Sequence, residues 1–170
     1  MHKNSAEIHM IAQEYSNLDR IDRAILHEIQ LDARLSNSAL SGRVNLSESA
    51  CLRRVRRLEQ SGMIRAYVGL VDQSSAGYPD NVFVQITLNS QQQDDLAAFE
   101  AAVRQLPEVM ECHLMSGEAD YLLRVIVSDA RDYERIHSQH LTRLPGVNRV
   151  QSSFALRTVT KKTEIPVRES

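Results

Sequence analysis

The spacing of apolar residues predicts a helix over about 18–31. Its apolar positions repeat every three or four residues, as one face of an α-helix requires; they are Leu18, Ile21, Ile25, Leu26 and Ile29. Ser16 or Asn17 can cap the start of this helix. Asp19 and Asp22 lie in its first turns and suit the positive end of the helix dipole.

Two further helices are predicted close behind the first. Ser36 can cap a short helix over about 37–43, and Ser47 can cap a longer one over about 48–60. Asn45 lies in the turn between them, where an asparagine can adopt the left-handed backbone conformation that glycine usually supplies. Three helices with a short turn before the third describe a helix-turn-helix.

Beyond residue 80 the pattern changes from a helical period to that of strands. Apolar residues alternate strictly with others at Val82, Val84, Ile86 and Leu88. Strands are predicted over about 82–88, 109–115, 121–127 and 147–156, and helices over about 94–106 and 130–144. This β-α-β-β-α-β order is the ferredoxin-like arrangement. The predicted fold class is therefore α+β, with an N-terminal winged-type helix-turn-helix followed by a ferredoxin-like βαββαβ domain.

These elements divide the chain into five predicted segments. They are a flexible N-terminal arm (1–16), a helix-turn-helix DNA-binding domain (17–63), a linker (64–80), a ferredoxin-like effector-binding and oligomerisation domain (81–160) and a C-terminal tail (161–170).

Positive charge gathers in and around the third helix. The chain has a formal net charge of -2, yet residues 43–65 hold six arginines and two glutamates. On a helical wheel Cys51, Val55 and Leu58 fall on one side, which predicts a buried face. Ser49, Arg53, Arg56 and Arg57 fall on the opposite side, and Ala50 and Arg54 flank the buried stripe. A basic face on a nearly neutral body suits a polyanion such as DNA, although a merely solvated helix face remains the alternative.

The N-terminal part of this third helix occupies the place where a recognition helix meets base edges. The residues predicted to contact DNA are Ser47, Glu48, Ser49, Ala50, Arg53, Arg54 and Arg57. Ser47 can act as the cap alone or also bind phosphate, and Glu48 can accept from a cytosine amino group or only favour the helix dipole. Arg56 leans further round the helix, where pairing with an acidic side chain is the alternative.

Several classes of protein are not favoured by the sequence. Cys51 and Cys112 show no framework spacing, and neither a membrane-length apolar run nor a secretory signal is present, which predicts a reduced, cytoplasmic protein. His137 and His140 lie three residues apart without further ligands, so no metal site and no cofactor are predicted. His113 follows Cys112 in a strand, where neighbours face opposite sides, so no enzyme activity is expected.

Short motifs spread over about 17–160 carry a resemblance. They are Leu18-Asp19-Arg20-Ile21-Asp22, Leu31-Asp32-Ala33-Arg34-Leu35-Ser36, Asn45-Leu46-Ser47, Arg54-Val55-Arg56-Arg57-Leu58-Glu59, Gly117-Glu118-Ala119-Asp120-Tyr121-Leu122 and Leu144-Pro145-Gly146-Val147. Together they resemble the Lrp/AsnC family of transcription regulators. Asn45 replaces the usual turn glycine, a departure that the turn tolerates. Glu48 occupies a position that is often proline and alters the tip of the reading helix, so the operator sequence is not inferred from the family.

The resemblance implies a DNA-binding regulator that responds to a small amino acid, with leucine or methionine as candidates. It further implies homodimers that often assemble into octamers, bound to double-stranded DNA, with the effector held between subunits by the loop after the second strand. The implied ligand-binding residues are Met115, Ser116, Gly117, Glu118, Asp120, Tyr121 and Leu122. Asp120 suits an α-ammonium group, and backbone N–H groups around Gly117 suit a carboxylate. An architectural DNA binder without effector and an amino-acid-binding module without a DNA role are the alternatives.

Overall fold

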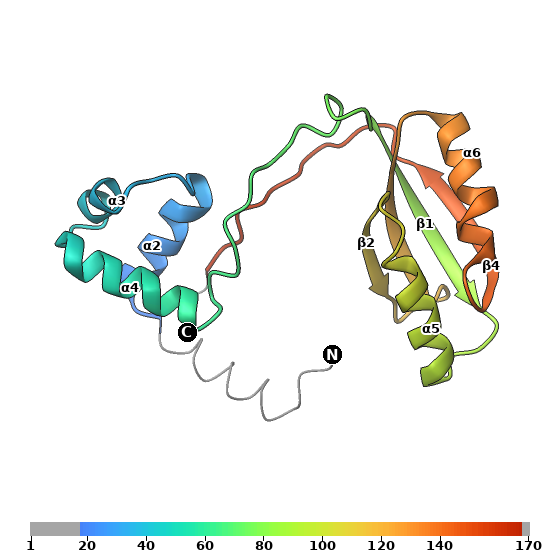
Figure 1. The fold of residues 1–170 in the computed structure, drawn as a ribbon, viewed down its shortest axis with the longest axis horizontal. Coiled ribbons are helices and arrows are strands. Elements are labelled where there is room, and N and C mark those ends of the chain that lie inside the picture. Colours follow the sequence, from blue (N-terminus) through green and yellow to red (C-terminus); the bar gives the residue numbers. More distant parts are fainter. Residues whose placement is uncertain (1–17, 168–170) are drawn as a thin grey trace. The chain divides into compact units, whose positions relative to one another are not determined.

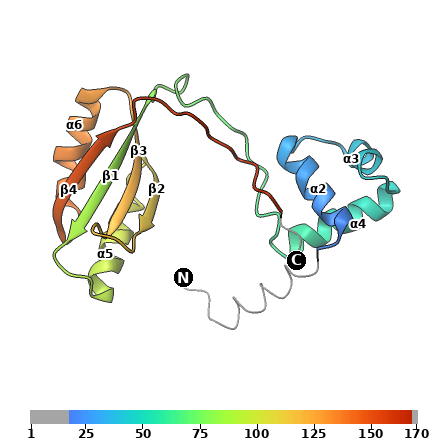
Figure 2. The same ribbon diagram turned by 180° about the vertical axis from the view of Figure 1, so that it is seen from behind.

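The computed structural model describes residues 18–167, which form two compact units. The first unit contains the residues up to Gly69 together with the segment from Thr160 onward, and the second unit contains Leu70–Val159. Figures 1 and 2 show both units from opposite sides. The predicted arm over 1–16 lies outside the described residues.

Three helices form the body of the first unit: α2 (Arg20–Leu31), α3 (Asn37–Arg43) and α4 (Glu48–Gln60). They agree with the predicted helices to within two residues. Their apolar faces meet in one small core, whose buried members are Ile25, Leu26, Leu40, Val44, Cys51 and Leu58. The apolar positions that repeat every three or four residues predict these helices correctly, because each helix buries only one face.

The cap of α2 is a correction to the sequence prediction. Asp19, rather than Ser16 or Asn17, is the N-cap residue, and its side chain accepts a hydrogen bond from the Asp22 backbone N–H at 2.8 Å. The Asp22 side chain in turn accepts from the Asp19 backbone N–H at 3.3 Å, which completes a capping box. Asp22 is fully buried, so its carboxylate needs partners inside the protein in addition to the helix dipole.

The turn between α3 and α4 has the predicted geometry. Asn45 has a φ of 54°, so an asparagine does adopt the left-handed conformation there. The Leu46 N–H donates to the Ser41 carbonyl at 2.9 Å across this turn, and Ser47 then caps α4. The predicted caps at Ser36 and Ser47 are both confirmed.

The second unit contains one four-stranded antiparallel sheet and two helices. Along the chain its elements are β1 (Asp80–Leu88), α5 (Gln93–Val103), β2 (Val109–Leu114), β3 (Tyr121–Val127), α6 (Ala130–Gln139), a 3-10 turn (Leu141–Arg143) and β4 (Val147–Phe154). The strand order in the sheet is β2-β3-β1-β4, and every neighbouring pair is antiparallel. The predicted ferredoxin-like βαββαβ fold is confirmed.

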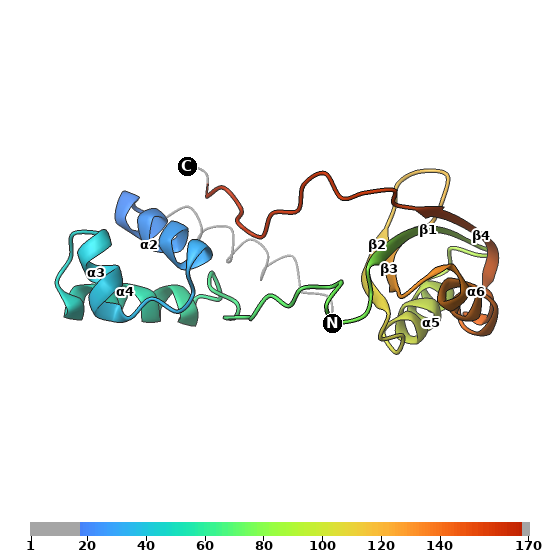
Figure 3. The same cartoon turned by 90° about the horizontal axis from the view of Figure 1, so that it is seen from above.

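Both helices pack on the same side of the sheet, as Figure 3 shows. Alternate residues of β1 and β3, such as Val84 and Leu123, are fully buried beneath them. The opposite face carries the other alternate residues, including Phe83, which is 40% exposed. The sheet therefore has one covered face and one open face.

The last predicted helix is shorter than expected. It was predicted to continue to residue 144, but α6 ends at Gln139, and the chain then winds as a 3-10 turn over Leu141–Arg143. A tightened last turn is a common way for an α-helix to end, and apolar spacing alone does not distinguish the two windings.

The C-terminal segment was predicted to be a tail, but it packs on the first unit. Glu164 forms an ion pair with His27 of α2 at 2.9 Å, and Ile165 is hydrogen bonded to Gln30. Val167 packs against the core of the three helices.

Between α4 and β1 the chain runs as coil and turns without a strand. None of the helices in the described range is long and apolar enough to cross a membrane.

Candidate nucleic-acid interface and effector loop

The exposed start of α4 is held by local contacts. The Ser47 hydroxyl accepts a hydrogen bond from the Ala50 backbone N–H at 3.3 Å, and Asn37 of α3 donates to the Glu48 carbonyl at 2.9 Å. Ser47, Glu48 and Ser49 are exposed, while Ala50 is half-buried. The first turn of α4 is thus fixed in place while its side chains remain open to a partner.

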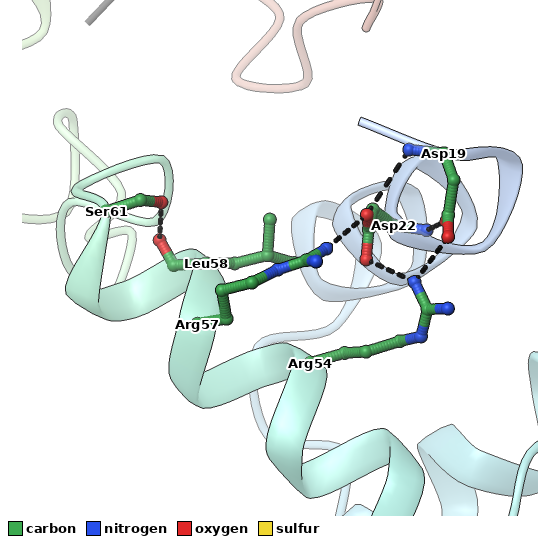
Figure 4. A network of polar contacts seen from close by, with 6 residues as sticks. All are labelled: Asp19, Asp22, Arg54, Arg57, Leu58 and Ser61. Carbon is green, nitrogen blue, oxygen red and sulfur yellow. Dashed lines mark hydrogen bonds and ion pairs between the residues drawn. The ribbon is translucent and has the colours of Figure 1, made fainter. Parts of the chain in front are cut away.

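The four arginines of α4 do not behave alike. Arg53 and Arg56 are exposed, and within residues 18–167 neither makes an ion pair. Arg54 and Arg57 instead reach across to the start of α2 (Figure 4). Pairing with an acidic side chain is the sequence-based alternative for Arg56, whereas the structure shows such pairing for Arg54 and Arg57.

The contacts of Arg54 and Arg57 converge on one buried carboxylate. Arg54 Nη1 donates to Asp22 Oδ1 at 2.8 Å and to Asp19 Oδ2 at 2.6 Å. Arg57 Nη2 donates to the other oxygen, Oδ2, of Asp22. The Asp22 side chain is only 1% exposed, so its charge is compensated inside the protein by two guanidinium groups.

The same contacts shift the pKa values of the residues around Asp22. The pKa of Asp19 is lowered, chiefly by the hydrogen bond from the Asp22 backbone N–H and further by Arg54. The pKa of Arg54 is raised, first by its hydrogen bond to Asp19 and then by that to Asp22. Both shifts favour the charged forms, which keeps the ion pairs intact at neutral pH.

The loop between β2 and β3 holds most of the predicted effector residues. The Met115 N–H donates to the Asp120 carbonyl at 2.8 Å, which closes the base of the loop. Met115, Ser116, Gly117 and Glu118 are exposed. A Cβ atom on Gly117 would meet nothing within 4 Å, and its φ lies outside the left-handed region. The turn itself therefore does not require a glycine at this position.

Asp120 is buried and already has partners within the chain. It is 6% exposed; its Oδ2 accepts from the Leu88 backbone N–H at 2.7 Å and its Oδ1 accepts from Gln91 Nε2 at 2.6 Å. The sequence argument assigned the compensating donor to an α-ammonium group. The chain supplies it instead, so the geometry assigns Asp120 to anchoring the loop against the end of β1.

Tyr121 and Leu122 face opposite sides of the sheet, as neighbours in a strand must. Tyr121 is 1% exposed, lies against the ring of Phe99 with centroids 4.5 Å apart, and donates its hydroxyl to Glu100 at 3.0 Å. Leu122 is half-buried on the open face. Of the two, only Leu122 lies on the face that a ligand or a second subunit can approach.

A small hollow on the open face joins the loop to the sheet. Its lining residues are Gln85, Thr87, Glu118, Ala119, Arg149 and Gln151. Glu118 of the loop and Arg149 of β4 therefore line the same hollow, and Arg149 donates to Gln151 within it at 3.2 Å. Sequence reasoning missed Gln91 and Arg149; the signal for Gln91 was that a buried carboxylate such as Asp120 needs a donor.

No group of three or more His, Cys, Asp or Glu residues that can hold a metal ion occurs in the described part of the chain. The rings of His137 and Tyr133 lie 5.9 Å apart on α6, which is an aromatic contact.

Two family models match the chain in succession. The model described as Winged helix-turn-helix DNA-binding matches residues 18–65, and the Lrp/AsnC ligand binding domain matches residues 81–165. The leucine-responsive regulatory protein of Salmonella typhimurium is 44% identical over 152 residues, which cover 89% of this chain and 93% of that relative. The chain belongs to the Lrp/AsnC family.

Solved structures of Lrp/AsnC regulators agree with the fold. The complex of a transcriptional regulator from Neisseria meningitidis with L-Met has a TM-score of 0.85 at 36% identity, covering 89% of this chain and 97% of that one. The feast or famine regulatory protein of M. tuberculosis, complexed with L-methionine, has a TM-score of 0.79 at 33% identity, covering 88% and 99%. The resemblance found in the sequence is therefore confirmed over nearly the whole chain.

Proposed function

We propose that this Lrp/AsnC protein is a transcription regulator that binds double-stranded DNA through α4 and responds to a small amino acid through the loop after β2. One observation carries the proposal: α4 presents exposed arginines beside an exposed helix start, in a chain whose other unit matches an amino-acid regulator's ligand-binding domain. Phosphate contacts from arginines supply affinity, and side chains at the helix start supply sequence choice.

The residues proposed for DNA contact keep the sequence prediction and refine it. Ser47, Glu48 and Ser49 are the candidates for base edges or the nearest phosphate, with Ala50 beside them. Arg53 is the candidate for phosphate contact, and the exposed Arg56 joins it. Arg54 and Arg57 enter the interface only if they leave Asp22, since both are paired in the free protein.

For the effector we propose the exposed side of the loop. A zwitterionic amino acid needs an anion for its ammonium group and donors for its carboxylate. Glu118 offers an accessible carboxylate, and Arg149 lies across the same hollow. The absence of a side chain on Gly117 leaves space beside the backbone that the turn itself does not use. Met115 and Leu122 are available to an apolar side chain, which favours methionine or leucine.

A homodimer is the proposed basic assembly, with octamers as its further association. The open face of the sheet exposes Phe83, and the linker exposes Val68 at 71%, Leu70 at 74% and Val71 at 80%. A second copy of the chain buries such surface without an additional protein. In a two-fold dimer on DNA the two recognition helices are expected about 34 Å apart, one turn of the double helix. Light scattering that showed only monomer at micromolar concentration contradicts this assembly.

The proposed role assigns no enzyme activity or cofactor, and it places the protein with the chromosome in the cytoplasm. The test combines a mobility-shift assay on genomic fragments at moderate salt with a thermal-shift screen of the twenty amino acids. We expect retarded fragments and a response to methionine or leucine in both assays. DNA binding without any amino-acid effect favours an architectural DNA binder, whereas amino-acid binding without DNA retention favours an effector-binding module.

A further inference from the structure

The contacts around Asp22 divide the arginines of α4 into two pairs. Arg54 and Arg57 converge on a carboxylate buried at the start of α2, as Figure 4 shows, whereas Arg53 and Arg56 extend from the same helix without an acidic partner in the described chain. All four lie along one hollow on the surface of α4, lined also by Ser49, Leu52 and Gln60. Charge that is counted as basic in the sequence is therefore only partly available to a polyanion.

We propose that Asp22, assisted by Asp19, competes with DNA phosphate for the arginines of α4 and so limits non-specific binding to DNA. The inference rests on the proposed DNA-binding function and adds to it a residue that determines specificity. Asp22 touches no base. It acts through Arg54 and Arg57, which are held toward α2 instead of extending from α4 as Arg53 and Arg56 do.

The physical basis is that a carboxylate and a phosphate present similar acceptors to a guanidinium group. Asp22 is buried and Arg54 is only 22% exposed, so solvent and salt screen this pair weakly. Asp19 adds a second acceptor to the same Nη1 atom. An Arg54 that moved to a phosphate would leave a buried carboxylate with one partner fewer, which is unfavourable. Arg53 and Arg56 are therefore the first arginines of α4 to contact the phosphates of the DNA backbone.

Arg57 is the arginine for which exchange is easier. Its side chain is 57% exposed, against 22% for Arg54, and Asp22 is its only acidic partner among the described residues. A tight, well-aligned site can draw Arg57 to a phosphate while Arg54 continues to compensate Asp22. Non-specific DNA offers a looser alignment and gains less from the same exchange. Competition of this kind widens the difference between specific and non-specific affinity.

The salt dependence of binding to a short random-sequence duplex measures this competition. Each phosphate contact by a cation contributes about 0.9 to the slope of log K against log salt concentration, or roughly three- to fourfold in affinity between 50 and 200 mM salt. We compare the neighbouring substitutions Arg53→Gln and Arg54→Gln, which remove the same charge from the same helix. Arg53→Gln is expected to lower the slope by about 1, whereas Arg54→Gln leaves it within error of wild type.

The reciprocal experiment removes the competitor. Asp22→Asn is expected to steepen the slope by about 1 to 2 and to strengthen random-sequence binding several-fold, because one or two arginines become available. Asp32→Asn makes the same charge change at an exposed position of the same unit, where no arginine side chain is paired, and is expected to change the slope little. Circular dichroism and thermal unfolding verify that each variant is folded.

The outcomes separate the inference from the function on which it rests. A wild-type protein that fails to bind DNA at low salt contradicts the proposed function itself. If wild type binds but folded Arg54→Gln lowers the slope as much as Arg53→Gln, Asp22 does not withhold Arg54 and the inference is wrong. If Asp22→Asn does not fold, the comparison of the two arginine variants decides alone. A folded Asp22→Asn whose slope is unchanged or shallower also overturns the inference.

Discussion

Gln30 and Ile165, which are 135 positions apart in the sequence, are joined by two hydrogen bonds. The Gln30 side-chain amide donates to the Ile165 carbonyl at 3.1 Å, and the Ile165 backbone N–H donates to Gln30 Oε1 at 2.8 Å. A glutamine side chain thereby pairs with both backbone groups of one residue. With the ion pair of His27 and Glu164, this attaches the C-terminal segment to α2.

Removal of residues 160–170 is therefore expected to destabilise the helix-turn-helix unit rather than only shorten a tail. The loss of Val167 packing and of these polar contacts should lower its unfolding free energy by about 1–3 kcal/mol. Hydrogen exchange of the α2 amides, with thermal unfolding, measures the effect. Gln30→Ala is expected to reproduce part of it, because it removes both hydrogen bonds to Ile165. Unchanged exchange of α2 in the longer truncation contradicts the prediction.

Acid should weaken the start of α2 through Asp19. The folded-state pKa of Asp19 lies below its ordinary value of 3.8, chiefly because its carboxylate accepts the Asp22 backbone N–H. A lowered pKa means that stability is present above the unfolded pKa and is lost as pH falls through the folded one. Wild type should thus lose stability below about pH 4. In Asp19→Asn this part of the loss should be absent, as measured by thermal unfolding at pH 6 and pH 3. Equal losses in both proteins count against it.

Asn45 should tolerate glycine better than any side chain branched at Cβ. Its φ of 54° is strained for most residues, by about 1–2 kcal/mol. Asn45→Gly is expected to leave the unfolding free energy nearly unchanged, whereas Asn45→Val should lower it by at least that amount. Urea denaturation at neutral pH measures both. A Val variant as stable as wild type would show that the turn adopts another conformation.

Asp120 and Glu118 should separate loop stability from ligand recognition. Asp120→Ala leaves the Leu88 N–H without its acceptor in a buried position, which is expected to cost about 1–3 kcal/mol of folding free energy. Glu118→Gln removes only an exposed charge, so stability should change little while methionine or leucine binding weakens by calorimetry. Should Asp120→Ala leave stability intact and Glu118→Gln bind normally, both assignments are wrong.

The sequence determined the elements and their order because burial is periodic. Helices that bury one face and strands such as β1, with alternate residues inside, leave a pattern that is independent of distant partners. The sequence also predicted the helix caps at Ser36 and Ser47 and the turn at Asn45, since each of these features depends on a few adjacent residues. The sequence also indicated the family, because the family's motifs are short runs of consecutive residues.

Tertiary structure decided which charges meet. Asp22 looked like a residue that favours the helix dipole, and Arg54 like a free cation, until packing placed α4 across the start of α2. Asp120 looked like a ligand group until the end of β1 brought Leu88 and Gln91 beside it. The C-terminal segment was predicted to be a tail, but the hydrogen bonds between Ile165 and Gln30 attach it to α2. Such pairings form when folding brings together segments that are far apart in the chain. The periodicity of the sequence shows which face of an element is buried, but it does not show which side chains of distant segments come into contact.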